Sequence, residues 1–139
     1  MAKIIIIGGS GHVGTYLVPR LVEAGNEVVN VSRGARQPYT PHAAWSRVQT
    51  VIADRDTEDA AGTFGPRIAA LDPDIVIDMI SFTLPSTQHL VEALRGRVQH
   101  FLHCGTIWVY GGNTAVPATE DQPLNAVGPY GVGKMDQEH

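Results

Sequence analysis

The chain has 139 residues, which suits one domain with a hydrophobic core. Its 14 acidic and 10 basic side chains are interspersed and give a net charge of −4, so no basic patch indicates a nucleic-acid partner. The single cysteine, Cys104, excludes an internal disulfide framework. Neither a signal peptide nor an apolar run long enough to cross a bilayer is present, so a cytoplasmic protein without a membrane partner is expected.

Five short apolar segments, the first a continuous β-branched run, predict buried strands, and the segments between them predict helices or loops. The predicted strands cover residues 3–8, 27–32, 48–54, 74–80 and 99–105. Helices are predicted at 13–24, at 57–71 with an interruption near Gly65 and Pro66, at 86–94 and from Tyr130 onward, and 33–45 is predicted to be loop. Strands that alternate with helices in this way imply an α/β fold with a doubly wound parallel sheet.

The first helix follows a glycine-rich turn and is amphipathic. Val13, Leu17, Leu21 and Ala24 are predicted to form its buried face, and Gly25 is predicted to end it.

The turn itself, GGSGHVG at residues 8–14, lies between a strand and a helix, which is the context that a dinucleotide-binding motif requires. A glycine at position 11 lets the backbone approach a pyrophosphate, and Gly14 allows close packing of helix on strand. The N–H groups of the helix N-terminus would bind the phosphates. The alternative is a tight turn without a ligand. The predicted cofactor contacts here are Gly8, Gly11, His12, Val13 and Gly14.

The spacing of Gly8, Gly11 and Gly14 resembles that of the short-chain dehydrogenase/reductase superfamily, in particular its extended NAD(P)-dependent epimerase/dehydratase branch. The resemblance covers nearly the whole chain and implies a Rossmann-type NAD(P)-binding domain at residues 1–139. Extended members are longer, so the chain is expected to be the N-terminal part of a larger protein and to be inactive in isolation. The uncovered sheet edge that this would leave favours association, such as a homodimer.

Specificity for the adenine ribose is predicted from the end of the second strand, which reads VSRG. An NAD-binding domain usually carries an acid at this place, but here Ser32 and Arg33 follow the strand. Arg33 could pair with a 2′-phosphate, so NADP is predicted to be preferred over NAD. The alternative is that Arg33 is a solvated loop charge.

Two further strand ends are predicted to contact the cofactor. In the family that the chain resembles, an acid at the position of Asp54 lies near the adenine amino group, although Asp54 could equally be a turn residue. Ile80, Ser81 and Phe82 end the fourth strand, where the ligand crevice of such a sheet lies, so they are predicted to lie near the nicotinamide-side ribose. The sequence DMISF at this place departs from the family pattern, which often has a histidine.

The catalytic residues are inferred from two further motifs. Aligning Val109-Tyr110-Gly111 with the family places Thr106 at the position of its catalytic serine or threonine, and Tyr130 and Lys134 match its YxxxK motif. Residues four apart lie on one face of a helix, and an ammonium beside a phenol favours the phenolate. Tyr130 would exchange a proton with the substrate, Thr106 would orient the substrate oxygen, and Lys134 would also reach the nicotinamide ribose.

The resemblance implies an oxidoreductase, epimerase or dehydratase acting on a hydroxyl or carbonyl of a small molecule such as a nucleotide sugar. The alternative is a non-catalytic relative that senses NADP(H) or binds RNA. No metal is expected, because none of the six histidines pairs with cysteine or carboxylate at a ligand spacing.

Overall fold

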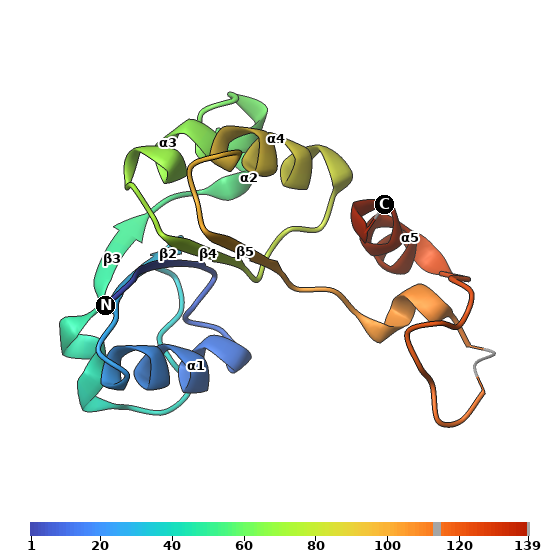
Figure 1. Ribbon diagram of the computed structural model, residues 1–139, viewed down its shortest axis with the longest axis horizontal. Coiled ribbons are helices and arrows are strands. Elements are labelled where there is room, and N and C mark those ends of the chain that lie inside the picture. The colour runs from blue at the N-terminus through green and yellow to red at the C-terminus, as the bar shows by residue number, and fades with distance from the viewer. Residues whose placement is uncertain (113–114, 139) are drawn as a thin grey trace.

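The computed structural model describes residues 1–112 and 115–138, which form a parallel five-stranded sheet flanked by helices (Figure 1). The strands are β1 (Lys3–Ile7), β2 (Glu27–Ser32), β3 (Gln49–Ile52), β4 (Ile75–Asp78) and β5 (His100–His103). Their order in the sheet is β3-β2-β1-β4-β5, and every neighbouring pair is parallel. This is the strand order of a doubly wound sheet, so the predicted fold class is confirmed.

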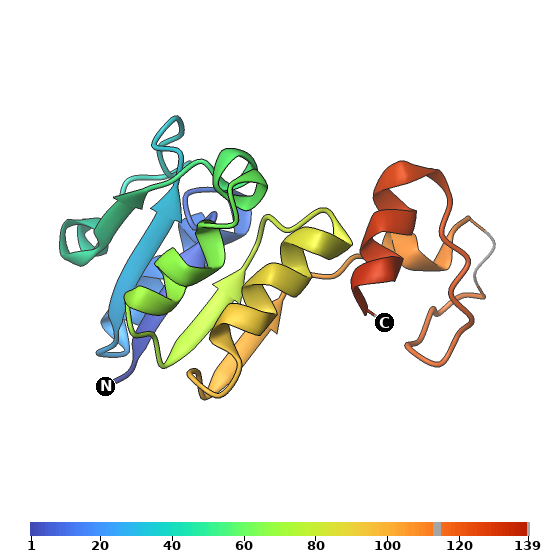
Figure 2. The same cartoon turned by 90° about the horizontal axis from the view of Figure 1, so that it is seen from above.

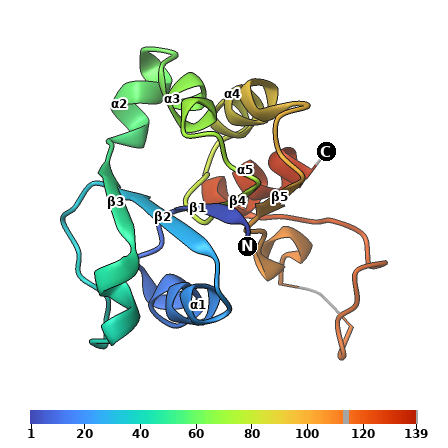
Figure 3. The same cartoon turned by 60° about the vertical axis from the view of Figure 1, so that its left-hand side comes forward.

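The helices lie on both faces of the sheet, except for the last one. They are α1 (His12–Glu23), α2 (Arg55–Ala60), α3 (Phe64–Ala70), α4 (Leu84–Leu94) and α5 (Gly128–Glu138), with 3₁₀ turns η1 (Ala43–Arg47) and η2 (Ile107–Tyr110). Helix α1 covers one face, and α2, α3 and α4 cover the other (Figures 1 and 3). Helix α5 and η2 lie beyond the β5 side of the sheet (Figure 2).

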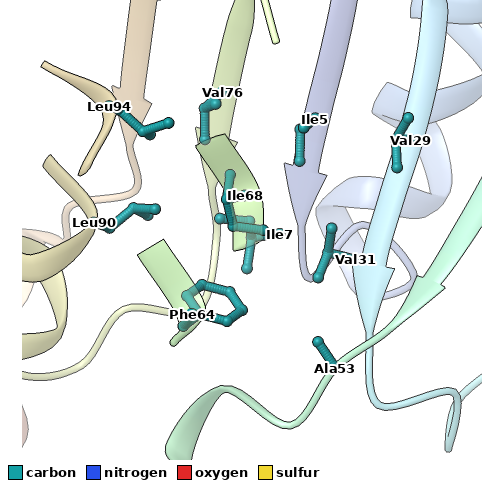
Figure 4. Close-up of a cluster of buried hydrophobic side chains, with 10 residues drawn as sticks. All are labelled: Ile5, Ile7, Val29, Val31, Ala53, Phe64, Ile68, Val76, Leu90 and Leu94. Atoms are coloured by element: carbon teal, nitrogen blue, oxygen red, sulfur yellow. The ribbon is translucent and has the colours of Figure 1, made fainter. Parts of the chain in front are cut away.

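Strand β1 is buried on both faces, as its unbroken apolar sequence predicts. Ile5 and Ile7 point toward α3 and α4 and belong to a cluster with Phe64 and Leu90 (Figure 4). Ile4 and Ile6 point to the face that α1 covers, because successive side chains of a strand alternate. The cluster on that face contains Ile4, Ile6, Val18, Val22, Val28 and Ala44.

The rotation of α1 differs from the prediction. Its buried residues are Gly14, Thr15, Val18, Pro19 and Val22, whereas Val13 and Ala24 are exposed. The physical reason is Gly14, at which a Cβ would overlap the carbonyl group of Gly9. This close approach of α1 to the turn after β1, rather than the largest apolar residues, decides which side of α1 faces the sheet. The predicted end is confirmed, since Gly25 has φ +88° and donates its N–H to Val22 O.

The predicted helix at 57–71 is two helices, and its interruption comes earlier than expected. The chain breaks at Gly62, which has φ +70°, while Gly65 and Pro66 lie in the first turn of α3. A proline is tolerated there because the first-turn N–H groups have no partner within a helix. The segment predicted as loop also ends in the 3₁₀ turn η1.

Candidate cofactor and catalytic site

The turn between β1 and α1 has the geometry of an anion-binding loop. Gly8 has φ +86°, a conformation that favours glycine, and its N–H donates to Val31 O at 2.8 Å. Gly11 is the N-cap of α1 and offers no side chain to the first-turn N–H groups. These groups and the positive end of the helix dipole therefore face outward, where a phosphate could bind them.

Two glycines of this loop should respond differently to substitution by alanine. At Gly11 a Cβ would meet only Gly8 O at 3.6 Å, so Gly11→Ala should fold normally but lose nucleotide affinity, because the Cβ would stand where a pyrophosphate approaches. At Gly14 the Cβ would overlap backbone, so Gly14→Ala should be destabilised by about 1–3 kcal/mol or more. Urea unfolding and nucleotide titration of both variants separate the two effects. Equal losses of stability would contradict the distinction.

A cavity of about 350 Å³ extends from this loop along the carboxyl ends of the strands. Its lining includes six of the residues predicted to bind the cofactor. They lie at or just after the carboxyl ends of β1, β2, β3 and β4. These are Gly8, Gly11, Ser32, Arg33, Asp54 and Ile80. The cavity lies where the strand order reverses between β1 and β4, which is where open α/β sheets bind ligands.

Other predicted cofactor residues do not line this cavity. The ring of His12 packs edge-on against Tyr16 and Tyr39, and the side chain of Val13 is exposed outside the cavity. Ser81 is buried, and its hydroxyl is 2.6 Å from that of Thr87. The carbonyl oxygen of Ser81 accepts a hydrogen bond from Lys134 on α5.

Besides the buried Arg55, two arginines line the cavity, Arg33 and Arg36. Both are exposed, and in the described part of the chain neither forms a salt bridge. Asp54 has a structural role, because its Oδ1 accepts the N–H of Thr57 at 3.2 Å and so caps α2. The capping role and a ligand contact are compatible, since a carboxylate has a second oxygen.

The sequence reasoning missed a buried ion pair beside the cavity. Arg55 Nη1 lies 2.6 Å from Asp78 Oδ1, and Arg55 Nε also contacts Asp59 Oδ2 at 3.3 Å. Asp78 Oδ1 accepts the N–H of Ile80 at 3.2 Å as well, so the pair holds the loop after β4. The available signal was an acidic residue inside the apolar strand sequence DIVIDMI, which requires a buried partner.

Helix α5 carries Tyr130 and Lys134 to this same loop. Lys134 Nζ donates to Ser81 O at 2.6 Å and to Cys104 O at 2.8 Å, and thereby ties α5 to the segments that follow β4 and β5. Tyr130 is 48% exposed, and its ring centroid lies 6.3 Å from that of Phe82. The pair is therefore placed next to the carboxyl ends of the strands.

Thr106 lies at the start of η2, against which α5 packs. Its Oγ1 accepts the N–H of Trp108 at 3.3 Å, which leaves the hydroxyl proton to donate elsewhere. The close packing is visible at Gly131, where a Cβ would lie 3.1 Å from Trp108 O. Thr106, Tyr130 and Lys134 thus come from two neighbouring elements beyond β5.

Burial affects the ionisation of two groups near α5. Removal from water lowers the pKa of Lys134 from its ordinary value, because the charged form loses hydration. Burial, and then the positive charge of Lys134, lower the pKa of His103. Both ring nitrogens of His103 are buried without a hydrogen-bond partner in the described structure, which also disfavours the imidazolium.

Together, the strand order, the glycine turn and the cavity define a nucleotide-binding α/β protein. The sequence profile of the NAD dependent epimerase/dehydratase family matches residues 4–139, and the chain belongs to this family. The resemblance inferred from the motifs is therefore confirmed.

Relatives of known activity agree with this assignment. The chain is 30% identical to a UDP-glucose 4-epimerase of Streptomyces lividans, over 99% of this chain and 46% of that protein. It is 29% identical to the 2′-dehydrokanamycin reductase of Streptomyces kanamyceticus, over 98% of this chain and 36% of that protein. The chain thus spans less than half the length of either relative.

A solved structure shows the same fold. The UDP-glucose 4-epimerase of Bifidobacterium longum, in complex with NAD+ and UDP, matches with a TM-score of 0.79 at 21% identity, over 98% of this chain and 47% of that one.

Within 1–112 and 115–138, no three histidine, cysteine or acidic side chains are grouped so that they could hold a metal ion. In the same ranges, every helix is too short or too polar to span a membrane.

Proposed function

We propose that this chain is the cofactor-binding part of an NAD(P)-dependent enzyme that acts on a hydroxyl or carbonyl carbon of a nucleotide sugar. The observation that carries the proposal is the meeting of α5 with the loop after β4. Lys134 Nζ is 2.6 Å from Ser81 O, one residue beyond Ile80, which lines the cavity. The candidate acid–base pair and the candidate cofactor cavity therefore adjoin each other.

The residues present fit a dinucleotide. The N–H groups at the start of α1 would hold the pyrophosphate, and the ends of β2 and β3 would hold the adenosine half. A bound nicotinamide supplies the hydride exchange.

The chemical roles of the chain's own residues follow from their positions. Tyr130 Oη would take a proton from the substrate hydroxyl or return one to a carbonyl oxygen. Thr106 would donate its hydroxyl proton to the same oxygen and orient it. Lys134 would contribute positive charge beside the Tyr130 phenol. This charge would stabilise the phenolate that forms when Tyr130 gives up its proton.

The relatives support the substrate class, since several are named as UDP-glucose 4-epimerases. A reductase among them indicates that the same fold also serves net reduction. The direct test is to incubate the complete enzyme, of which this chain is the proposed cofactor-binding part, with NAD(P) and UDP-sugars and to follow epimer formation and cofactor absorbance. Turnover of no nucleotide sugar with either cofactor would contradict the proposed substrate class.

We further propose that NADP is the preferred cofactor, because Arg33 and Arg36 face the cavity without salt-bridge partners in the described structure. Arg33→Asp should weaken NADPH binding by about tenfold or more, the loss of a hydrogen bond to a charged group, and should leave NADH binding nearly unchanged. Isothermal titration calorimetry with both cofactors measures this.

Arg47→Asp is the matched control, because it makes the same charge change at an exposed residue outside the cavity. The NADP preference would be wrong if Arg33→Asp still bound NADPH more tightly than NADH, or if Arg47→Asp had the same effect as Arg33→Asp.

A further inference from the structure

Phe82 stands between the cofactor cavity and the α5 side chains. It follows β4, is 53% exposed, and lines both the large cavity and a neighbouring one of about 300 Å³. Its ring centroid lies 5.2 Å from Lys134 Nζ and 6.3 Å from the ring of Tyr130. Neither Tyr130 nor Lys134 lines either cavity.

The ammonium group of Lys134 is closed off in this arrangement. The residue is only 2% exposed, and two of the three Nζ protons can be assigned to the carbonyl oxygens of Ser81 and Cys104. The face of the Phe82 ring takes the remaining side through a cation–π contact. A ribose in the cavity could not contact Lys134 unless one of these three partners moved.

Of the three partners, Phe82 is the one that can move at least cost. The carbonyl groups of Ser81 and Cys104 belong to backbone at the ends of β4 and β5, and Ser81 is fully buried. The Phe82 backbone is also fixed, since its carbonyl oxygen would be 2.9 Å from a Cβ at Gly133. Its side chain, however, is more than half exposed and can change rotamer on its own.

We propose that Phe82 is a gating residue, whose ring covers Lys134 and turns aside to admit the cofactor's nicotinamide-side ribose. That the incoming group is a cofactor ribose rests on the proposed function. That the Phe82 ring covers Lys134 does not depend on it. Because only the open rotamer exposes Lys134, the apparent affinity for the cofactor is reduced by the fraction of molecules that are open. Removing the Phe82 ring should therefore both expose the amine of Lys134 and strengthen cofactor binding.

The cover can be measured without any activity, because the chain has only two lysines, Lys3 and Lys134. Brief acylation with acetic anhydride, followed by peptide mass spectrometry, gives the labelling of Lys134 relative to Lys3, whose side chain is 29% exposed. Phe82→Ala should raise this ratio by about tenfold, the size expected when a partly desolvated cation–π cover is removed. Leu102→Ala, which removes an exposed apolar side chain from β5, should leave it unchanged.

Calorimetric titration with NADPH completes the test, with thermal melting to show that each variant is folded. Tighter binding by Phe82→Ala than by the wild type is expected. An unchanged labelling ratio would overturn the cover, and weaker binding by a folded Phe82→Ala would overturn the gate, since the ring would then be a surface on which the cofactor rests. If no variant bound NADPH, the proposed function would fail, and the labelling ratio alone would still decide whether Phe82 covers Lys134.

Discussion

Replacing Tyr130 by phenylalanine is expected to lower turnover by about 10²–10⁴-fold, because general acid–base catalysis by a positioned side chain contributes that much. The loss corresponds to about 3–5 kcal/mol of activation free energy. The ring would remain beside Phe82, so folding and nucleotide binding should not change. Steady-state kinetics with the substrate identified by the UDP-sugar assay measures kcat, and calorimetry with NADPH measures binding.

Tyr16→Phe is the matched control, because it removes an exposed phenol hydroxyl from α1 and leaves α5, the helix that carries Tyr130, unchanged. Its turnover should equal that of the wild type. Near-normal turnover of Tyr130→Phe would remove Tyr130 from the mechanism. A parallel loss of nucleotide affinity would mean instead that the hydroxyl supports the binding site.

The largest effect on stability is expected at the buried ion pair. Arg55→Met would leave the Asp78 carboxylate, which is fully buried, without its partner at 2.6 Å. An uncompensated buried charge should lower the free energy of unfolding by about 3–5 kcal/mol. Urea denaturation followed by circular dichroism gives this quantity.

Two comparisons make the ion-pair prediction specific. Lys3→Met breaks the partly exposed pair with Glu27, whose atoms are 3.7 Å apart, and should cost at most about 1 kcal/mol. Adding Asp78→Leu to Arg55→Met should recover much of the lost stability, because it removes the orphaned charge. An Arg55→Met protein as stable as Lys3→Met would show that the pair is not needed for folding.

The sequence pointed to six of the residues that line the cavity, but not to the contacts around α5. The glycine turn is a local feature: spacing, the preceding apolar strand and the following helix are contiguous in the chain. The cover over Lys134 is different, since it joins Phe82, Ser81 and Cys104 from two loops to a helix residue. No spacing rule relates such segments, because their contact depends on how the loops leave the sheet.

Errors in the predicted elements have the same origin. The apolar residues of α1 predicted a buried face of Val13, Leu17, Leu21 and Ala24, but the contact of Gly14 with Gly9 turns a different face toward the sheet. Likewise, Gly65 and Pro66 suggested where the crossover helix breaks, yet the break is at Gly62. In both cases a residue's propensity was outweighed by packing or by a backbone conformation that the sequence pattern does not reveal.

By itself, the sequence determined the parallel α/β fold, the glycine turn and the family, because strand and helix periodicities and motif order are properties of contiguous residues. Only the tertiary structure decided that Asp78 pairs with Arg55 and that Phe82 separates the cavity from Lys134. Buried charges and covered amines are stabilised by partners distant in the chain, so their environment exists only once the sheet has brought those partners together.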